Sequence, residues 1–487
     1  MRVLILMALV GLMAAARSFE VPGQSVGSAT ALAVGFLLLC AYLMGWVAKN
    51  LHMPKLTGYL LAGILAGDSV LGLIPAAAAG DLKIFTGVAV SLIALTAGTE
   101  LEMRTMRPLL RTVGLITGIA GVGTVAVIAL AAWLMRDLLP FMAELSPSGC
   151  IAMAAVLGVV ISANSPAVVV ALRTEMSADG PLCRTVLGAV VMGDLLVIVL
   201  FAGVGAAAAP YLGNASDQGA LVHLVWHVGG SLVAGAALAG LLWLYLRYVA
   251  QSTALFVVAL AFVVAEVGQR IGLDPLLVAL SAGILVRNAS SVGDALHEAI
   301  EGSSLPVYLV FFGAAGASIH LDVLQLVGVP ALLFAVVRAL SYLATSRLAT
   351  ALAGAESVVQ RYAGVGMLPQ AGLALALGLL MVKTFPAVGE GAGTLVLGVV
   401  AINEMVMPIL YRQALLRSGE AGRGDAGVSA AFPIVPPDGS GGMLLDEGWD
   451  DAAASSTAGT VKRPRPAASR ARPIRTGDTL PPDLPRG

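Results

Sequence analysis

Residues 149–172 read GCIAMAAVLGVVISANSPAVVVAL, a long apolar run interrupted in its middle by Ser162-Ala163-Asn164-Ser165-Pro166. Proline cannot donate a backbone hydrogen bond and disfavours helical geometry in the residue before it, so two half-helices joined by a break are predicted. A second run, residues 358–382, is interrupted in the same way at Gly366-Met367-Leu368-Pro369-Gln370-Ala371-Gly372. Two such interrupted helices in an apolar chain indicate a transport site at the middle of a membrane.

The composition of the whole chain agrees with a membrane protein. Of its 487 residues, 58% are hydrophobic and 12% are charged, whereas a soluble domain carries about 25% charged residues. The formal net charge of −1 does not favour a nucleic-acid partner. Backbone polar groups must be satisfied internally in lipid, and the apolar runs are too continuous for barrel strands. We therefore expect an all-helical polytopic membrane protein embedded in the lipid bilayer.

Thirteen apolar segments divide into six, one and six, so the second half is inverted relative to the first. The two interrupted segments are the fifth members of the two halves, which predicts two inverted six-helix repeats whose broken helices cross. The thirteen segments are residues 28–49, 56–73, 83–98, 108–136, 149–172, 182–209, 223–249, 253–271, 275–289, 303–317, 322–352, 358–382 and 391–417.

The two ends of the chain differ from the transmembrane domain, residues 28–417. Residues 1–27 resemble a signal sequence or form a short N-terminal helix. Residues 418–487 are rich in Pro, Gly, Ala and charged residues and are predicted to be a disordered tail. The loop flanks on one side carry most of the Lys and Arg, including Lys49, Arg173 and Arg412. This bias predicts a cytoplasmic C-terminus, and the expected location is a cell membrane, such as a bacterial inner membrane.

Asp194 is the acid that we expect to bind the transported ion. It lies within the apolar sixth segment, between Met192-Gly193 and Leu195-Leu196. An ionisable residue at a helix centre costs about 2.5–3.5 kcal/mol on insertion scales, so such residues are rare and usually functional. Burial disfavours the charged carboxylate. A carboxylate placed there can hold a proton or a dehydrated cation but not readily both, which is the requirement for an exchanger.

Four further ionisable residues are candidates for supporting roles. Arg338 lies within the eleventh segment and needs a buried acceptor, either a carboxylate or the carbonyl end of a broken helix. Glu266 and Glu404 are buried-acid candidates, and Glu404 lies on the repeat mate of the segment that carries Asp194. Glu100 ends the third segment beside Arg104, and we expect it to belong to an interfacial charge cluster.

Several stretches, in their order and spacing, resemble the monovalent cation:proton antiporter superfamily, which includes the sodium/proton exchangers. They are residues 56–67 (LTGYLLAGILAG), 95–102 (LTAGTELE), 164–169 (NSPAVV), 187–194 (LGAVVMGD) and 370–375 (QAGLAL). The resemblance implies a secondary antiporter without a cofactor, acting as a homodimer, that exchanges Na⁺ or K⁺ for H⁺.

The resemblance also implies roles for single residues. Asp194 would be the cation and proton site, Asn164, Ser165 and Gln370 would line the crossing, and Arg338 would stand where relatives carry Lys or Arg. Gly193 departs from the family pattern, in which Asp, Asn or Gln commonly precedes the aspartate. One titratable acid beside a fixed arginine predicts electroneutral exchange of one proton for one cation.

Other functions stay open on the sequence. A sodium-coupled symporter of the same architecture would need a polar pocket for an organic substrate, and the crossing is sparse in polar residues. A sensor-like relative that does not transport is a further alternative. An intramembrane aspartyl protease would need a second acid sharing a proton with Asp194. Its Tyr-Asp pair is absent from the sequence, so an enzyme is not expected.

Overall fold

The computed structural model describes residues 2–18, 26–74, 83–212, 226–249, 251–290, 292–301, 304–319 and 321–423. All secondary structure in these ranges is helical. The predicted disordered tail lies outside the described residues from 424 onward, whereas residues 418–423 belong to the described part.

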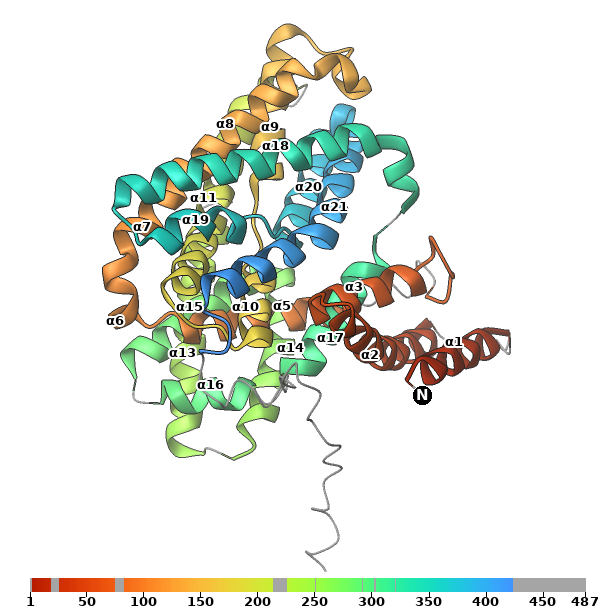
Figure 1. Cartoon of the computed structure of the whole chain (residues 1–487), viewed down its shortest axis with the longest axis vertical. Coiled ribbons are helices and arrows are strands. Elements are labelled where there is room, and N and C mark those ends of the chain that lie inside the picture. Colours follow the sequence, from red (N-terminus) through yellow and green to blue (C-terminus); the bar gives the residue numbers. More distant parts are fainter. Residues whose placement is uncertain are drawn as a thin grey trace, which may run out of the picture. The chain divides into compact units, whose positions relative to one another are not determined.

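Most of the chain forms α-helices, which Figure 1 shows in their arrangement. Their bounds are α1 Arg2–Ser18, α2 Val26–Asn50, α3 Lys55–Ala66, α5 Lys83–Glu100, α6 Met103–Met106, α7 Leu110–Leu115, α8 Val122–Leu134, α9 Pro147–Ser162, α10 Pro166–Met176, α11 Pro181–Ala208, α13 Ser231–Tyr248, α14 Thr253–Ile271, α15 Pro275–Ala289, α16 Gly293–Glu301, α17 Ser304–Ala317, α18 Leu321–Ala353, α19 Ser357–Gly366, α20 Gly372–Thr384 and α21 Pro386–Ser418.

Each of the thirteen predicted segments coincides with a helix or a broken helix. By length and composition, 7 helices of the described part are long and apolar enough to cross a membrane, or up to 8 if α16 and α17 count as one bent span. The multi-pass, all-helical prediction is confirmed, and the number of thirteen crossings stays a prediction. Residues 1–27, predicted as a signal or a short helix, include helix α1.

Both predicted helix breaks are present. The first separates α9 from α10 at residues 163–165, and the second separates α19 from α20 at residues 367–371. The two halves of the first broken helix begin alike, with a Ser N-cap followed by Pro: Ser146 caps α9 and Ser165 caps α10. In the most apolar 18-residue stretch of the broken helix α9–α10, 94% of the residues are buried inside the protein, so this helix is a central element of the fold.

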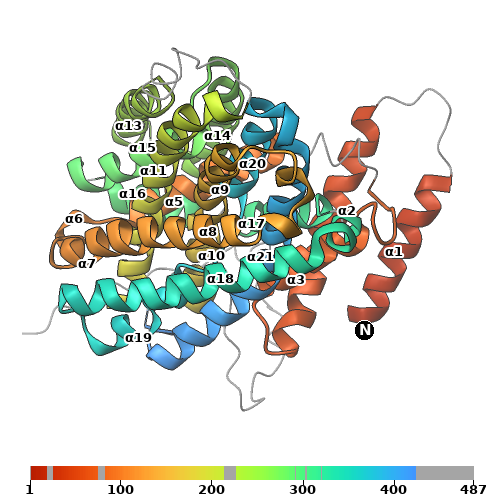
Figure 2. The same cartoon turned by 90° about the horizontal axis from the view of Figure 1, so that it is seen from above.

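Helix contacts divide the described helices into two sets. We call the helices that carry or pack on the breaks, α7 to α11 and α18 to α21, the break set. Here α9 packs on α8 and α11, while α18 packs on α8, α19 and α21. Helices α8 and α18 run side by side in both views (Figures 1 and 2). The break set therefore surrounds the first broken helix with long helices.

The second set, which we call the scaffold set, comprises α2, α3, α5 and α13 to α17. Helix α17 packs on α2, α3 and α5, and α15 packs on α5 and α13. Small residues allow close contacts between these helices. A Cβ atom added to Gly98 on α5 would lie 2.4 Å from the carbonyl oxygen of Leu280 and 2.9 Å from the Cα of Gly283 on α15. The two helices therefore approach each other as closely as membrane helices with small residues do.

Candidate functional site

The two helix breaks contact each other directly. The side-chain amide of Asn164, in the first break, donates to the carbonyl of Met367 in the second. In return, Nε2 of Gln370 in the second break donates to the carbonyl of Ile161 at 3.0 Å. Backbone carbonyls at helix ends have no partner within the helix. The predicted crossing is therefore a reciprocal exchange in which each break supplies an amide to a carbonyl of the other.

Arg338 binds the carbonyl ends of both broken helices. Its side chain is fully buried on α18. Nε donates to Ile161 O at 2.9 Å, Nη2 to Ala163 O at 2.8 Å, and Nη1 to Leu368 O at 2.6 Å. The sequence left two kinds of acceptor open for Arg338, a carboxylate or the carbonyl end of a broken helix. In the structure the acceptors are carbonyls at the helix ends. The positive charge lies where the negative ends of two helix dipoles meet.

Two residues of the crossing were not singled out from the sequence. Tyr342, one turn after Arg338, donates its hydroxyl to Ser162 O at 2.6 Å and to Oδ1 of Asn164 at 3.2 Å. Asn403 on α21 donates to Oε1 of Gln370 at 2.7 Å. The available signal was their polar character inside apolar segments, next to residues already chosen.

Asp194 lies beside this crossing, on α11, and its carboxylate differs from every group described above. The residue is 2% exposed, and neither carboxylate oxygen has a hydrogen-bond partner among the described residues. The preceding residue, Gly193, packs against the crossing, since a Cβ atom built there would lie 3.4 Å from Oδ1 of Asn164. A buried carboxylate without donors is costly unless it is protonated or binds a cation.

One other acid interacts electrostatically with Asp194, namely Asp274 at the start of α15. Asp274 is engaged elsewhere. Its Oδ1 accepts from the backbone of Leu276 at 2.9 Å and so caps α15, and its Oδ2 lies 3.8 Å from Nε2 of His227. Asp274 therefore adds negative charge near Asp194 but already has partners of its own.

The remaining predicted residues occupy different surroundings. Ser165 caps α10 by accepting from Val168 N at 3.4 Å. Glu404 is buried at 6% exposure, as expected. The expectation that Glu266 is buried is wrong: its side chain is 49% exposed and pairs with Arg270 at 2.6 Å, one turn further along α14. Glu100 does belong to a charge cluster, but its ion-pair partner is Arg173 on α10.

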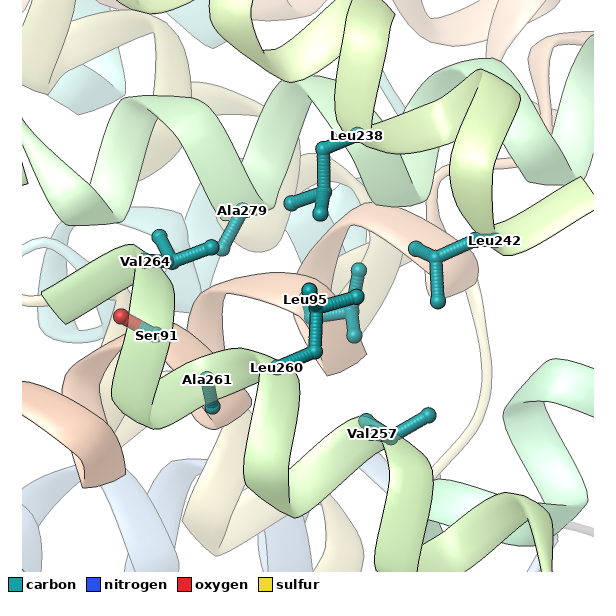
Figure 3. A pocket seen from close by; sticks show the side chains of 9 residues that line it. All are labelled: Ser91, Leu95, Leu238, Leu242, Val257, Leu260, Ala261, Val264 and Ala279. Carbon is teal, nitrogen blue, oxygen red and sulfur yellow. The ribbon is translucent and has the colours of Figure 1, made fainter. Parts of the chain in front are cut away.

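An apolar pocket lies within the scaffold set, away from the crossing. It is lined by α5, α13, α14 and α15, and Figure 3 shows that Ser91 supplies its one polar side chain. The hydroxyl of Ser91 is already bonded to Gly87 O at 3.0 Å. This pocket has no group that could hold an ion. In the described part of the chain no cluster of His, Cys, Asp and Glu could hold a metal either.

The comparison with protein families decides the assignment. The sequence model described as "Sodium/hydrogen exchanger, transmembrane" matches residues 35–417. The chain belongs to the sodium/hydrogen exchanger family. It is therefore a multi-pass membrane transporter of the cation:proton antiport type and not an enzyme, and the resemblance inferred from the motifs is confirmed.

Solved structures agree with this assignment at the level of the fold. The sodium proton antiporter MjNhaP1 from Methanocaldococcus jannaschii at pH 8 matches with a TM-score of 0.59 and 18% identity, over 84% of this chain and 100% of that chain. An electron-microscopy map of the same antiporter matches with a TM-score of 0.63 and 19% identity, over 79% and 96% of the two chains. No curated protein matches the sequence.

Proposed function

We propose that this exchanger binds its cation and its proton alternately at Asp194. The observation that supports this most directly is the state of the carboxylate, which is buried and has no hydrogen-bond partner on either oxygen within the described part of the chain. A structural carboxyl would donate to or accept from a neighbour, because unsatisfied buried polar groups are destabilising. A group that alternates between a proton and a dehydrated cation needs both oxygens free. Competition of the two cargoes for one carboxylate then couples their fluxes.

The crossing supplies a rigid support for that chemistry. Arg338, Tyr342 and Gln370 tie the break carbonyls together, and Asn164 lies against Gly193. Because Arg338 donates to carbonyls, its charge is already balanced by helix dipoles and does not neutralise Asp194. The amide oxygen of Asn164 is the neutral oxygen beside Gly193 that could contribute to a cation's coordination.

Exchange at one free acid is expected to be electroneutral, one proton for one Na⁺ or K⁺. Asp274 interacts with Asp194, but its own oxygens are engaged: Oδ1 caps α15 through Leu276 N, and Oδ2 lies 3.8 Å from Nε2 of His227. We further propose a homodimer in the cell membrane of a bacterium, with the C-terminus in the cytoplasm as the distribution of Lys and Arg indicates.

The test is a proton-flux assay in inverted membrane vesicles that contain the full chain. Adding Na⁺, K⁺ and Li⁺ separately should release protons with at least one cation, without an organic co-substrate. Asp194→Asn should abolish the release, because the amide cannot take up or release a proton in this pH range. Proton release that persists in Asp194→Asn would refute the site, and a current under a cation gradient would refute electroneutrality. Flux that requires an organic substrate would instead identify a symporter.

A further inference from the structure

Contacts between the break set and the scaffold set concentrate at one face of the protein. The principal helix pairs that join the sets are α10 with α5, α10 with α3, and α21 with α3. The polar contacts between these helices lie toward the end of α10 or α21 and at the start of α3 or the end of α5. Figure 1 shows α10 and α5 next to each other. We call this the α10 face.

The first polar contact at the α10 face is an ion pair. Arg173 near the end of α10 donates through Nη1 to Oε2 of Glu100, the last residue of α5. Their side chains are 19% and 8% exposed, so solvent screens this pair less than it screens a surface pair. Arg173 is also held within the break set, since its Nε donates to Ala178 O at 3.2 Å. The guanidinium is therefore preorganised to bind Glu100.

The second contact joins the same helix to α3. Oε1 of Glu175 accepts a hydrogen bond from the backbone N of Lys55 at 2.7 Å, at the first residue of α3. The carboxylate thus caps a scaffold helix from the break set and lies at the positive end of its dipole. Nearby, Nη1 of Arg412 on α21 donates to His52 O at 2.9 Å, in the turn before α3.

The opposite end of the scaffold set has a different electrostatic character. Helix α15 begins at Asp274 and ends near Asn288, whose Nδ2 donates to Leu101 O just after Glu100. The last turn of α15 therefore lies near the α10 face, and its first residues, next to Asp274, lie at the opposite end of the helix. At that far end the described charge that interacts with Asp194 is another acid. The two sets are thus joined by opposite charges at the α10 face, whereas at the start of α15 Asp274 lies 3.8 Å from His227.

We propose that Glu100–Arg173 and the Glu175 cap of α3 form the gate that closes the α10 face and must break during each transport cycle. The proposal rests on the proposed function, because alternating access requires one set of helices to move against the other. Both contacts join ends of helices from different sets, so they can separate without breaking either set internally. In this proposal Glu100 and Glu175 control the conformational change and do not contact the transported ion.

The experiment is amide hydrogen exchange, measured by mass spectrometry on the full chain in lipid nanodiscs. Glu100→Gln and Glu175→Gln weaken one gate contact each. The control is Glu266→Gln, which removes an acid whose partner, Arg270, lies on the same helix. We expect residues 51–60 and 166–178 to exchange roughly tenfold faster in both gate variants, as loss of one charged hydrogen bond implies. The control should exchange at the native rate.

Two outcomes overturn the gate. One is native protection of both segments in both gate variants. The other is faster exchange spread over the whole chain in both, which would mark the contacts as general stabilisers. Repeating the measurement in an Asp194→Asn background separates this proposal from the proposed function, because opening of the face does not require ion exchange. If Asp194→Asn still transports while the gate variants show faster exchange at the α10 face, the gate proposal is supported and the proposed ion site at Asp194 is refuted.

Discussion

The crossing of the broken helices and the α10 face satisfy their charges in opposite ways. At the crossing, the cation Arg338 binds three carbonyls, while the carboxylate of Asp194, on the neighbouring helix α11, has no hydrogen-bond partner among the residues that the structure describes. At the α10 face Glu100 binds Arg173, and beside it, within the break set, Asp179 binds Arg184. Pairing every charge would be the more stable solution for Asp194 as well. Its isolation beside the crossing is therefore the feature that distinguishes a transport site from a structural ion pair.

Helix dipoles balance the charge of Arg338, so this residue does not need a carboxylate as its partner. Had the arginine bound Asp194, the acid would stay ionised and paired, and neither a proton nor a cation could compete for it. The helix ends at the two breaks supply negative dipole ends instead. Breaking the helices thus has two effects, since it opens polar backbone at the site and leaves the acid free.

The largest expected effect comes from removing the charge at the crossing. Arg338→Met deletes three hydrogen bonds and leaves buried carbonyls unpaired. Breaking a buried charged contact costs about 3–5 kcal/mol, so the variant should lose most of its thermal stability in detergent and all exchange. The control is Arg361→Met, since Arg361 is exposed and lies over the Tyr362 ring at 5.4 Å. Equal melting temperatures of the two variants would contradict the role of Arg338.

A smaller effect is expected from the neutral part of the crossing. Asn403→Leu removes the donor to Oε1 of Gln370 and leaves a buried acceptor unpaired, at a cost of about 1–3 kcal/mol. Gln370→Leu should cost a similar amount, because it leaves the buried amide of Asn403 without its acceptor and removes one of the two donors to Ile161 O. The double variant should be more stable than the sum of the two losses predicts, since the shared bond is lost only once. Strictly additive losses, measured by thermal unfolding, would show that the two residues do not act together.

The sequence predicted the crossing better than the α10 face, for a physical reason. Pro166 and Pro369 interrupt apolar runs, and that local chemistry alone predicts two breaks. Arg338 could be recognised as buried and in need of an acceptor. The sequence does not show which acceptor Arg338 binds, because that depends on how the helices face each other. For the same reason it does not show that Glu100 binds Arg173, seventy-three residues away. In a helix surrounded by lipid, the outward face is as apolar as the inward face, so the sequence pattern does not show which face is buried. The prediction that Glu266 is buried is wrong for this reason.

The next effect in size concerns the helix that carries Asp194. Just after α21, the buried carboxylate of Glu420 accepts from Leu182 N at 2.7 Å and Cys183 N at 2.8 Å, and so caps α11. Glu420→Ala should lower stability by about 1–2 kcal/mol. Glu356 is the matched control, because it precedes α19 and makes no side-chain capping bond. If Glu356→Ala lowers the melting temperature as much, the capping role of Glu420 is refuted.

The smallest expected effect tests the pairing of charges at the α10 face through pH. Burial acts to raise the pKa of Asp179, but the hydrogen bond and charge of Arg184, together with the charge of Arg173, outweigh it and hold the pKa below its ordinary value of 3.8. A depressed pKa stabilises the folded state above the unfolded pKa, and this stabilisation is lost as the pH falls through the folded pKa.

Asp179→Asn should therefore lower stability at neutral pH, by at most about 1 kcal/mol for such a partly exposed pair, and should match the native protein in acid. The measurement is the difference in melting temperature between native and variant protein at pH 7 and at successively lower pH below 3.8. Asp137→Asn provides the control, since Asp137 is 85% exposed and 3.7 Å from Arg136. A difference for Asp179→Asn that is independent of pH would mean that its geometry, rather than its charge, holds the face together. The contrast with Asp194 would then rest on the crossing alone.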